Sequence, residues 1–438
     1  MSRTRSAFMF AAALCVLIAS SSWAAEAGEI PSEEALAKPL PDFSPLPSLR
    51  FEQALRSAAD THPTVALKLS EQNATEFGVE GARWQRWPGL SVSSSHGTLG
   101  NTLTEVQLEQ PLWTGGRITA GINAAQARAD AARAGVAEAK QAVIERTVNA
   151  YAEAMRLQAR IAAATDTIAD YQRLTGLIDR RVDTGISPKS DGVNVRAKLQ
   201  QAQGELLQLT LQLRNARAEL EVLIGRRFGE LVPPLALRKS APNLDESLQA
   251  AIGSAPTLGR LAAEERAAEE TIAATKSSLS PALSVRYNRT FGGGTLYASD
   301  QVFIGVTYQP GSGLASMSAI SEAESRRTGA IHSSEAARRE LIDRVRSFWN
   351  LAESSQSETA VLNELVLSTQ QVYESCLRQF PVGRRTWLEV LLARRDATQA
   401  QYAIADATWA GFAARIKLDL VTGQLAARHY RPDYQEVE

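Results

Sequence analysis

The chain has 438 residues, of which 22% are charged, and its formal net charge is only −1. Acidic and basic residues are nearly equal in number, so the charge gives no electrostatic sign of a nucleic-acid-binding protein. The sequence has only two cysteines, which excludes a disulfide-rich scaffold.

Residues 1–24 have the pattern of a secretory signal peptide. Arg3 and Arg5 precede an apolar stretch, and Ser22-Trp-Ala24 is a small-x-small cleavage site. The apolar stretch is shorter than the ~20 residues that a transmembrane helix needs. We therefore expect an exported protein that begins, after cleavage, with an N-terminal extension over residues 25–47.

Cys376 is the one cysteine that remains after this cleavage, so no internal disulfide is expected. It keeps a spacing of three and four residues with the preceding apolar side chains, including Leu365 and Val372. This register favours a thiol packed in a core over a reactive one.

Four long proline-free stretches, rich in Ala, Leu, Gln, Glu and Arg, predict long helices. They cover residues 112–187, 189–232, 311–380 and 382–431. The second contains a heptad pattern formed by Leu199, Leu206, Leu209, Leu213, Ala216, Leu220 and Leu223. Such a pattern needs a partner helix. A helix over residues 115–183 would be about 100 Å long, so we expect rods packed side by side.

Shorter segments alternate apolar with polar residues, as strands do. They lie at residues 89–96, 102–112, 282–291 and 299–309. Aromatic residues such as Trp87, Trp113 and Tyr308 gather near their ends, which is typical of the girdles of membrane β-barrels. A small soluble sheet that caps a helical bundle is the alternative.

The sequence repeats itself. Pro63 and Pro88 recur 193 residues later as Pro256 and Pro281, and Gly185 recurs 198 residues later as Gly383. We infer an internal duplication.

The expected organisation has a first repeat at residues 48–241, a second at 242–424 and a C-terminal tail at 425–438. Each repeat contains one short helix, two strands, a long helix, a turn and a returning helix. The long helices are expected over residues 115–183 and 314–379, and the returning helices over 190–226 and 385–422.

The fold class is thus predicted to be α+β. Four strands cannot close a barrel, because the smallest outer-membrane barrels need about eight. An open sheet edge in lipid would leave backbone groups unpaired. If the strands span a membrane, three identical chains would supply a 12-stranded barrel, continued by a coiled-coil barrel of helices.

This layout, with the two turn motifs Gly185-Ile-Ser-Pro-Lys-Ser-Asp191 and Val382-Gly-Arg-Arg-Thr-Trp-Leu-Glu-Val-Leu391, resembles the TolC-type outer-membrane channel family. The resemblance covers roughly residues 48–424. It implies a homotrimer in the lipid of the Gram-negative outer membrane, with a helical tunnel that extends into the periplasm. The implied partners are a periplasmic adaptor (membrane fusion) protein and an inner-membrane ABC exporter or proton-driven pump.

The resemblance also implies a gate, a constriction at the periplasmic end of the tunnel. Gly185, Pro188, Pro381 and Gly383 would shape the two turns there. Arg385 would face Ser190, beside Asp191, and three copies of Glu389 would form a ring that favours cations.

Two positions depart from the family pattern. Relatives have a tyrosine, bonded to the acid that matches Asp191, where this chain has Phe380, which lacks a hydroxyl. They also have a second acid where this chain has Leu392. The gate is therefore expected to be weaker or differently built.

The residues of the motif from Arg385 to Leu391 are more similar to those of family members that serve type I secretion of large proteins than to those of drug-efflux members. This resemblance favours a passive exit duct for type I secretion of a protein such as an adhesin. The alternative is the outer-membrane component of a multidrug or small-molecule efflux pump. A structural exported coiled-coil protein is a third, remote reading.

No catalytic residue, metal site, cofactor or nucleic-acid partner is predicted. The four histidines share no metal-ligand spacing. They are His62, His96, His332 and His429. Gly292-Gly-Gly294 lacks the Lys-Ser/Thr of a phosphate-binding loop.

Overall fold

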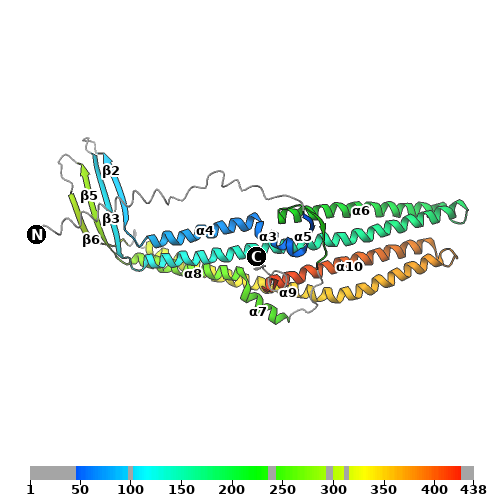
Figure 1. Ribbon diagram of the computed structural model, residues 1–438. Coiled ribbons are helices and arrows are strands. Elements are labelled where there is room, and N and C mark those ends of the chain that lie inside the picture. The colour runs from blue at the N-terminus through cyan, green and yellow to red at the C-terminus, as the bar shows by residue number, and fades with distance from the viewer. Residues whose placement is uncertain (1–45, 97–101, 235–242, 293–298, 310–314, 426–438) are drawn as a thin grey trace, which may run out of the picture.

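The computed structural model describes residues 46–96, 102–234, 243–292, 299–309 and 315–425. It is an elongated molecule with four long strands at one end and two helical hairpin turns at the other (Figure 1). The expected signal peptide, residues 1–24, lies outside the described residues.

The first half of the chain contains two short helices, a strand pair and two long helices. They are α3 (Phe51–Thr61), α4 (Pro63–Trp84), β2 (Gly89–His96), β3 (Thr102–Trp113), α5 (Arg117–Asp183) and α6 (Lys189–Ile224). The second half repeats this order with α7 (Leu244–Ser254), α8 (Pro256–Lys276), β5 (Ala282–Gly292), β6 (Ser299–Thr307), α9 (Ala315–Gln379) and α10 (Trp387–Val421).

The short helix expected in each half is in fact two helices. The residue before each proline, His62 or Ala255, has an extended backbone with ψ of 130° or 115°. A proline ring disfavours the helical conformation of the preceding residue, but it is well tolerated in the first turn of the next helix. Pro63 and Pro256 therefore end one helix and begin another.

The long strands form one antiparallel sheet in the order β2-β3-β5-β6. One row across the sheet is apolar and lies on one face: Leu90, Leu108, Tyr287 and Val302. The next row is polar and lies on the other face: Ser91, Gln107, Asn288 and Gln301. On the polar face the Glu109 carboxylate accepts a charged contact from Arg286 at 3.1 Å. The sheet thus has one mainly apolar face, which also contains the ion pair of Arg289 and Asp300, one mainly polar face and, among the described residues, two free edges, β2 and β6.

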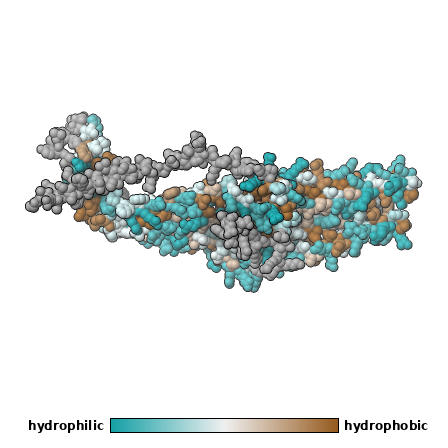
Figure 2. Space-filling model, in the orientation of Figure 1, coloured by the Kyte–Doolittle hydropathy of each residue, from teal (hydrophilic) through white to brown (hydrophobic). Residues whose placement is uncertain are grey.

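The apolar face of the sheet is exposed in the single chain. Val92, Ile304 and Val306 keep 64%, 75% and 69% of their surface. Hydrophobic surface is visible at this end of the molecule in Figure 2. Among the described residues, no helix is both long enough and apolar enough to cross a membrane.

The long helices of the turn-bearing half lie side by side in the order α6-α5-α10-α9 (Figure 1). The heptad residues of α6 face the core of the chain. Leu209, Leu220 and Leu223 are buried, and Leu206 and Leu213 contact the same core. The partner helix that the heptad pattern of α6 predicts is α5. A second core cluster lies towards the turns and includes Cys376, which is buried.

A second, two-stranded parallel sheet was not predicted. It joins β1 (Leu46–Leu49) to β4 (Phe228–Leu231), with Leu46 opposite Phe228. β1 begins inside the range expected to be an N-terminal extension. It leads into Phe51, whose ring packs 5.1 Å from both Tyr151 and Phe412. This pairing fixes the start of the described chain to the middle of the molecule.

Candidate functional site at the paired turns

The two turns at the far end of the helices have the same backbone geometry. Gly185 and Gly383 both have φ of 74°, which an L side chain rarely adopts. In each turn the glycine N–H donates to the carbonyl three residues back, and the next N–H donates to the carbonyl five residues back. These are the bonds of a Schellman motif, which satisfies the last carbonyls of a helix.

Each turn then starts a new helix. Pro188 has an extended backbone and precedes the first residue of α6, and its carbonyl accepts from the N–H of Asp191 at 3.1 Å. Ser190 is exposed in the first turn of that helix. Pro381 follows Phe380, the residue just after the end of α9, and Thr386 caps α10.

The side chains around Thr386 form a compact charged group. Glu389 Oε2 accepts from the Thr386 N–H at 2.6 Å, and the Thr386 hydroxyl accepts from the Glu389 N–H at 3.3 Å. Arg385 Nη1 donates to the other carboxylate oxygen, Oε1, at 2.8 Å. Hydrogen bonds from Thr386 and then from Arg385 lower the pKa of Glu389. Both carboxylate oxygens are therefore occupied, and the glutamate charge is neutralised within its own turn.

This arrangement differs from the expected pairing of Arg385 with Ser190. In the single chain the guanidinium lies on Glu389, and none of the hydrogen bonds among the described residues joins it to Ser190 or Asp191. A contact between turns of different chains stays a prediction for the assembled protein.

Phe380 has a partner that the sequence did not reveal. It is buried, and the guanidinium of Arg181 at the end of α5 lies 4.8 Å from the centre of its ring. The ring also packs 5.2 Å from that of Trp387, the first residue of α10. An arginine–aromatic contact thus joins the two turns at Phe380, where the resemblance led us to expect a weaker or differently built gate.

Further along the helices, a buried polar cluster joins α5 to α10. Arg394 is 2% exposed, and its Nε lies 2.9 Å from an oxygen of Asp170. Its Nη2 donates to the hydroxyl of Thr167 at 3.1 Å, which in turn lies 2.8 Å from the hydroxyl of Thr398. Arg173 also contacts Asp170. Asp170 is thus shared by both arginines, and its carboxylate offsets the buried charge of Arg394, as burial requires.

Sequence reasoning missed this cluster, although a signal was present. Arg394 falls three and four residues from Leu391, Val390 and Ala397, all of which are buried. A charged residue in an apolar register of this kind indicates a buried ion pair. Its partner cannot be deduced by spacing, because Asp170 lies on a distant helix.

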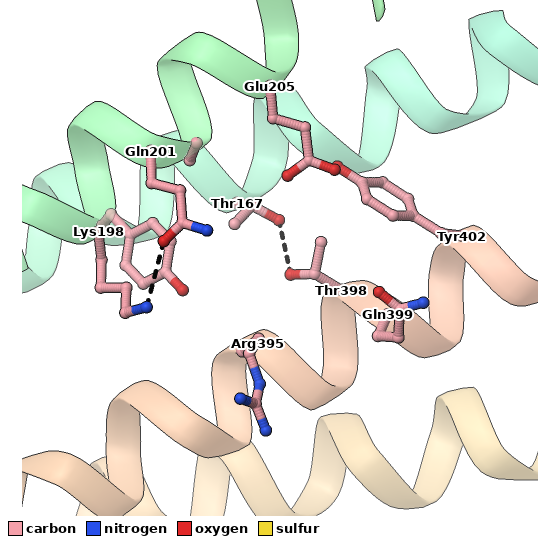
Figure 3. A pocket seen from close by; sticks show the side chains of 10 residues that line it. Thr167, Lys198, Gln201, Glu205, Arg395, Thr398, Gln399 and Tyr402 are labelled. Atoms are coloured by element: carbon pink, nitrogen blue, oxygen red, sulfur yellow. Dashed lines mark hydrogen bonds between the residues drawn. The ribbon is translucent and has the colours of Figure 1, made fainter.

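A polar groove runs beside the cluster between α6 and α10 (Figure 3). Thr167 and Thr398 lie at its base, Lys198 and Gln201 on one wall, and Gln399 on the other. Glu205 on α6 lies against Tyr402 on α10 in Figure 3. Burial, together with the charge of Glu205 and its hydrogen bond, raises the pKa of Tyr402 to about 12.

The described residues contain no group of three or more His, Cys, Asp or Glu side chains that could hold a metal ion. What the turns offer instead is a set of arginines and carboxylates, the aromatic contact of Phe380, and two helical hairpins that meet side by side. This arrangement is typical of the end of a helical rod.

The fold is thus built from an amphipathic sheet and long helical hairpins. The family model for outer membrane efflux proteins matches residues 50–226 and, a second time, residues 247–424. The chain belongs to the outer membrane efflux protein family.

Known proteins of this kind resemble the chain over most of its length. The cobalt-zinc-cadmium resistance protein CzcC of Cupriavidus metallidurans is 24% identical over 387 residues, which cover 86% of this chain and 90% of CzcC. The outer membrane protein TolC of Vibrio cholerae is 23% identical, over 70% of this chain and 73% of TolC. The crystal structure of the outer membrane protein VceC from Vibrio cholerae has a TM-score of 0.76 at 15% identity, and covers 85% of this chain and 96% of VceC.

The chain is thus an outer-membrane channel protein of the TolC type, and not an enzyme. The predicted family, the α+β fold class and the location in the outer membrane with an extension into the periplasm are confirmed. The duplication is reflected in the two successive matches of one family model.

Proposed function

We propose that three copies of this chain form the exit duct of a tripartite export system. The observation that carries this proposal is the unfinished surface of the single chain. Its sheet has one exposed apolar face and two free edges, β2 and β6. Joining β2 of one copy to β6 of the next would close twelve strands into a barrel with the polar face inside. The backbone groups of every edge strand would then have hydrogen-bond partners.

The duplication supports the same assembly among the helices. α5 corresponds to α9 and α6 to α10 at a constant separation of 198 residues, from Arg117 and Ala315 to the cap glycines Gly225 and Gly423. Inside one chain, α5 contacts α10. The corresponding pair is α9 of one copy and α6 of the next, so a closed ring would repeat one type of contact six times.

The exposed side chains fit this ring. On α9, Val361, Leu365 and Val372 are 67%, 43% and 54% exposed. Their counterparts 198 residues earlier on α5 are Ala163, Thr167 and Leu174, all buried. On α6, Val193 and Leu207 are exposed, whereas their counterparts on α10, Leu391 and Ala405, are buried. A second copy would cover these apolar residues, which a soluble single chain has no reason to expose in such a register.

The turn end of such a trimer would lie in the periplasm and act as the gate. The polar groove beside Thr398 (Figure 3) opens between two helices near that end. A helical hairpin of a periplasmic adaptor is the partner that we expect to occupy it. An inner-membrane ABC exporter or proton-driven pump would deliver the cargo.

For the cargo, we propose type I secretion of a protein such as an adhesin, on the basis of the motif from Arg385 to Leu391. Efflux of small molecules or metal ions is the second candidate, because similar proteins include a cobalt-zinc-cadmium resistance protein, CzcC, and an outer membrane efflux protein, BepC of Brucella suis. The charges of the turn do not decide between them, since Arg385 neutralises Glu389.

Deleting the gene in its host tests the two cargoes. Protein secretion predicts that one large protein disappears from the culture supernatant, measured by mass spectrometry, while tolerance to dyes and to cobalt, zinc and cadmium salts is unchanged. Restoring the gene should restore secretion. Loss of tolerance with an intact set of secreted proteins would instead favour efflux and contradict the secretion proposal.

A further inference from the structure

The mainly apolar face of the sheet changes in character along its strands. On β6, in the part nearer the helices, every second residue on this face is apolar or aromatic: Tyr308, Val306, Ile304 and Val302. The next residue on the same face is Asp300, which lies opposite Arg289 on β5. Further from the helices come two polar pairs on β2 and β3, Ser94 with Thr104 and His96 with Thr102. The face is thus apolar towards the helices and polar towards its far end.

The position of this change matches the depth of a membrane. Tyr308 and Asp300 are eight residues apart, which is about 27 Å along a strand. Strands of membrane barrels tilt by about 35–45°, so this length spans about 20 Å of depth, close to the ~25 Å apolar band of such barrels. Because aromatic residues mark membrane interfaces, we place Tyr308 at the periplasmic interface. Arg289 and Asp300 then lie at the outer edge of the apolar band.

Arg289 is held in a way that leaves part of its guanidinium free. Its Nε lies 3.5 Å from Asp300 Oδ1. The guanidinium lies 4.9 Å from the centre of the ring of Phe291, which is two residues further from the helices. The side chain therefore points towards the far end of the sheet. Among the described residues, no hydrogen bond or ion pair involves its two Nη groups, so their N–H donors are available to a ligand.

We propose that Arg289 binds a phosphate group of a phosphorylated glycolipid in the outer leaflet of the membrane. This inference rests on the proposed channel, whose sheet spans the outer membrane with its apolar face in lipid. The helices extend into the periplasm, so the far end of the sheet reaches the outer leaflet, where phosphorylated glycolipids are found. A guanidinium matches the oxygens of a phosphate with two parallel N–H donors.

The neighbours of Arg289 suit the other parts of such a lipid. Asp300 holds Nε and so turns the Nη groups outwards. The Phe291 ring is exposed and offers a surface for an acyl chain. In the same row as Phe291, the hydroxyls of Thr104 and Ser94 lie 3.2 Å apart and give a sugar headgroup a polar surface. The site is complete within one chain, so a trimer would have three.

Arg286 provides a matched control on the same strand. It is also paired with a carboxylate, since its Nε lies 3.1 Å from Glu109. It lies on the polar face, however, and its Nη2 donates to the Thr307 hydroxyl. In the proposed barrel this face lines the lumen, where no membrane lipid reaches.

Lipid binding to the purified protein in mild detergent tests the inference. The probes are bis-phosphorylated lipid A, the same lipid after removal of its phosphates, and phosphatidylglycerol. Native mass spectrometry counts the bound lipids, and the shift of the thermal unfolding midpoint during a titration gives an apparent Kd. We expect Arg289→Gln to bind bis-phosphorylated lipid A about tenfold more weakly than the natural protein. The lipid without phosphates should bind both proteins equally.

Two further variants guard against an effect on folding. Arg289→Gln with Asp300→Asn removes the ion pair without leaving a lone carboxylate in lipid, and should show the same loss. Arg286→Gln should bind lipid A as the natural protein does. Equal binding of lipid A by the natural protein and both Arg289 variants would overturn the inference, and so would an equal loss in Arg286→Gln. Phosphatidylglycerol that binds as tightly as lipid A would contradict the assignment to a glycolipid.

The mass of the protein separates this inference from the channel proposal. A trimer whose binding of lipid A does not depend on Arg289 would contradict the lipid site alone. A folded species with the mass of one chain would contradict the proposed channel.

Discussion

Glu389 uses its carboxylate for two tasks at once. One oxygen accepts the backbone N–H of Thr386 and so completes the cap of α10, and the other accepts the guanidinium of Arg385. Because hydrogen bonds lower the pKa of Glu389, its charge persists to more acidic pH than that of an ordinary glutamate. In the proposed trimer, the expected ring of three glutamates would therefore be a ring of three ion pairs.

Replacing Arg385 should leave the Glu389 carboxylate without its ion-pair partner. We expect Arg385→Ala to raise the single-channel conductance and the preference for cations in planar bilayers, because three carboxylates lose their neutralising partners at the constriction. The trimer should remain intact, since Arg385 and Glu389 are exposed surface groups. Glu389→Gln is the matched variant and should lower the cation preference. A conductance of Arg385→Ala equal to that of the natural protein would show that this turn is a plain connector.

Phe380 should contribute to the stability of the turn end through its two ring contacts. Phe380→Leu keeps an apolar side chain but removes the contacts with Arg181 and Trp387, which together are worth about 1–3 kcal/mol. We expect a lower thermal unfolding midpoint by circular dichroism, or a local increase in amide hydrogen exchange around residues 181–187. Val382→Ala, at a side chain that is 69% exposed, is the control and should change neither. Equal behaviour of both variants would mean that the ring contacts do not stabilise the turns.

At the scale of the elements, α6 has two apolar faces with different partners. Leu209, Leu213 and Leu220 face the core of their own chain. Leu207 and Leu211 are 63% and 48% exposed, on the side where we propose the next copy. In the proposed trimer, this one helix would therefore serve both the folding of the chain and its assembly.

The two faces should respond differently to a charge. Leu213→Asp should cost several kcal/mol, because the carboxylate meets a core without a partner, and should reduce the helical signal in circular dichroism. Leu211→Asp should leave the helices folded but weaken the trimer, seen as a smaller mass by light scattering in detergent. The reverse pattern, with Leu211→Asp unfolding the helices, would show that the heptad register has been assigned wrongly.

For the whole molecule, the long rods and strand pairs are predictable because their signals are local. Proline-free stretches, the heptad of α6 and the alternation of Leu90 and Val92 each follow from neighbouring residues. The cluster of Arg394, Asp170 and Thr167 could not be predicted in the same way, because Arg394 lies more than two hundred residues from the other two in the sequence. The β1–β4 pair was missed because two strands of four residues contain too few positions to show alternation.

The mass of the purified protein tests the proposed assembly most directly. Extracted from outer membranes in mild detergent and measured by light scattering or native mass spectrometry, the protein should have three times the mass of one mature chain. In the proposed trimer, pooled strands close the sheet, and a neighbouring copy covers Val361 and Leu365. A folded, monodisperse species with the mass of a single chain would contradict the trimeric channel.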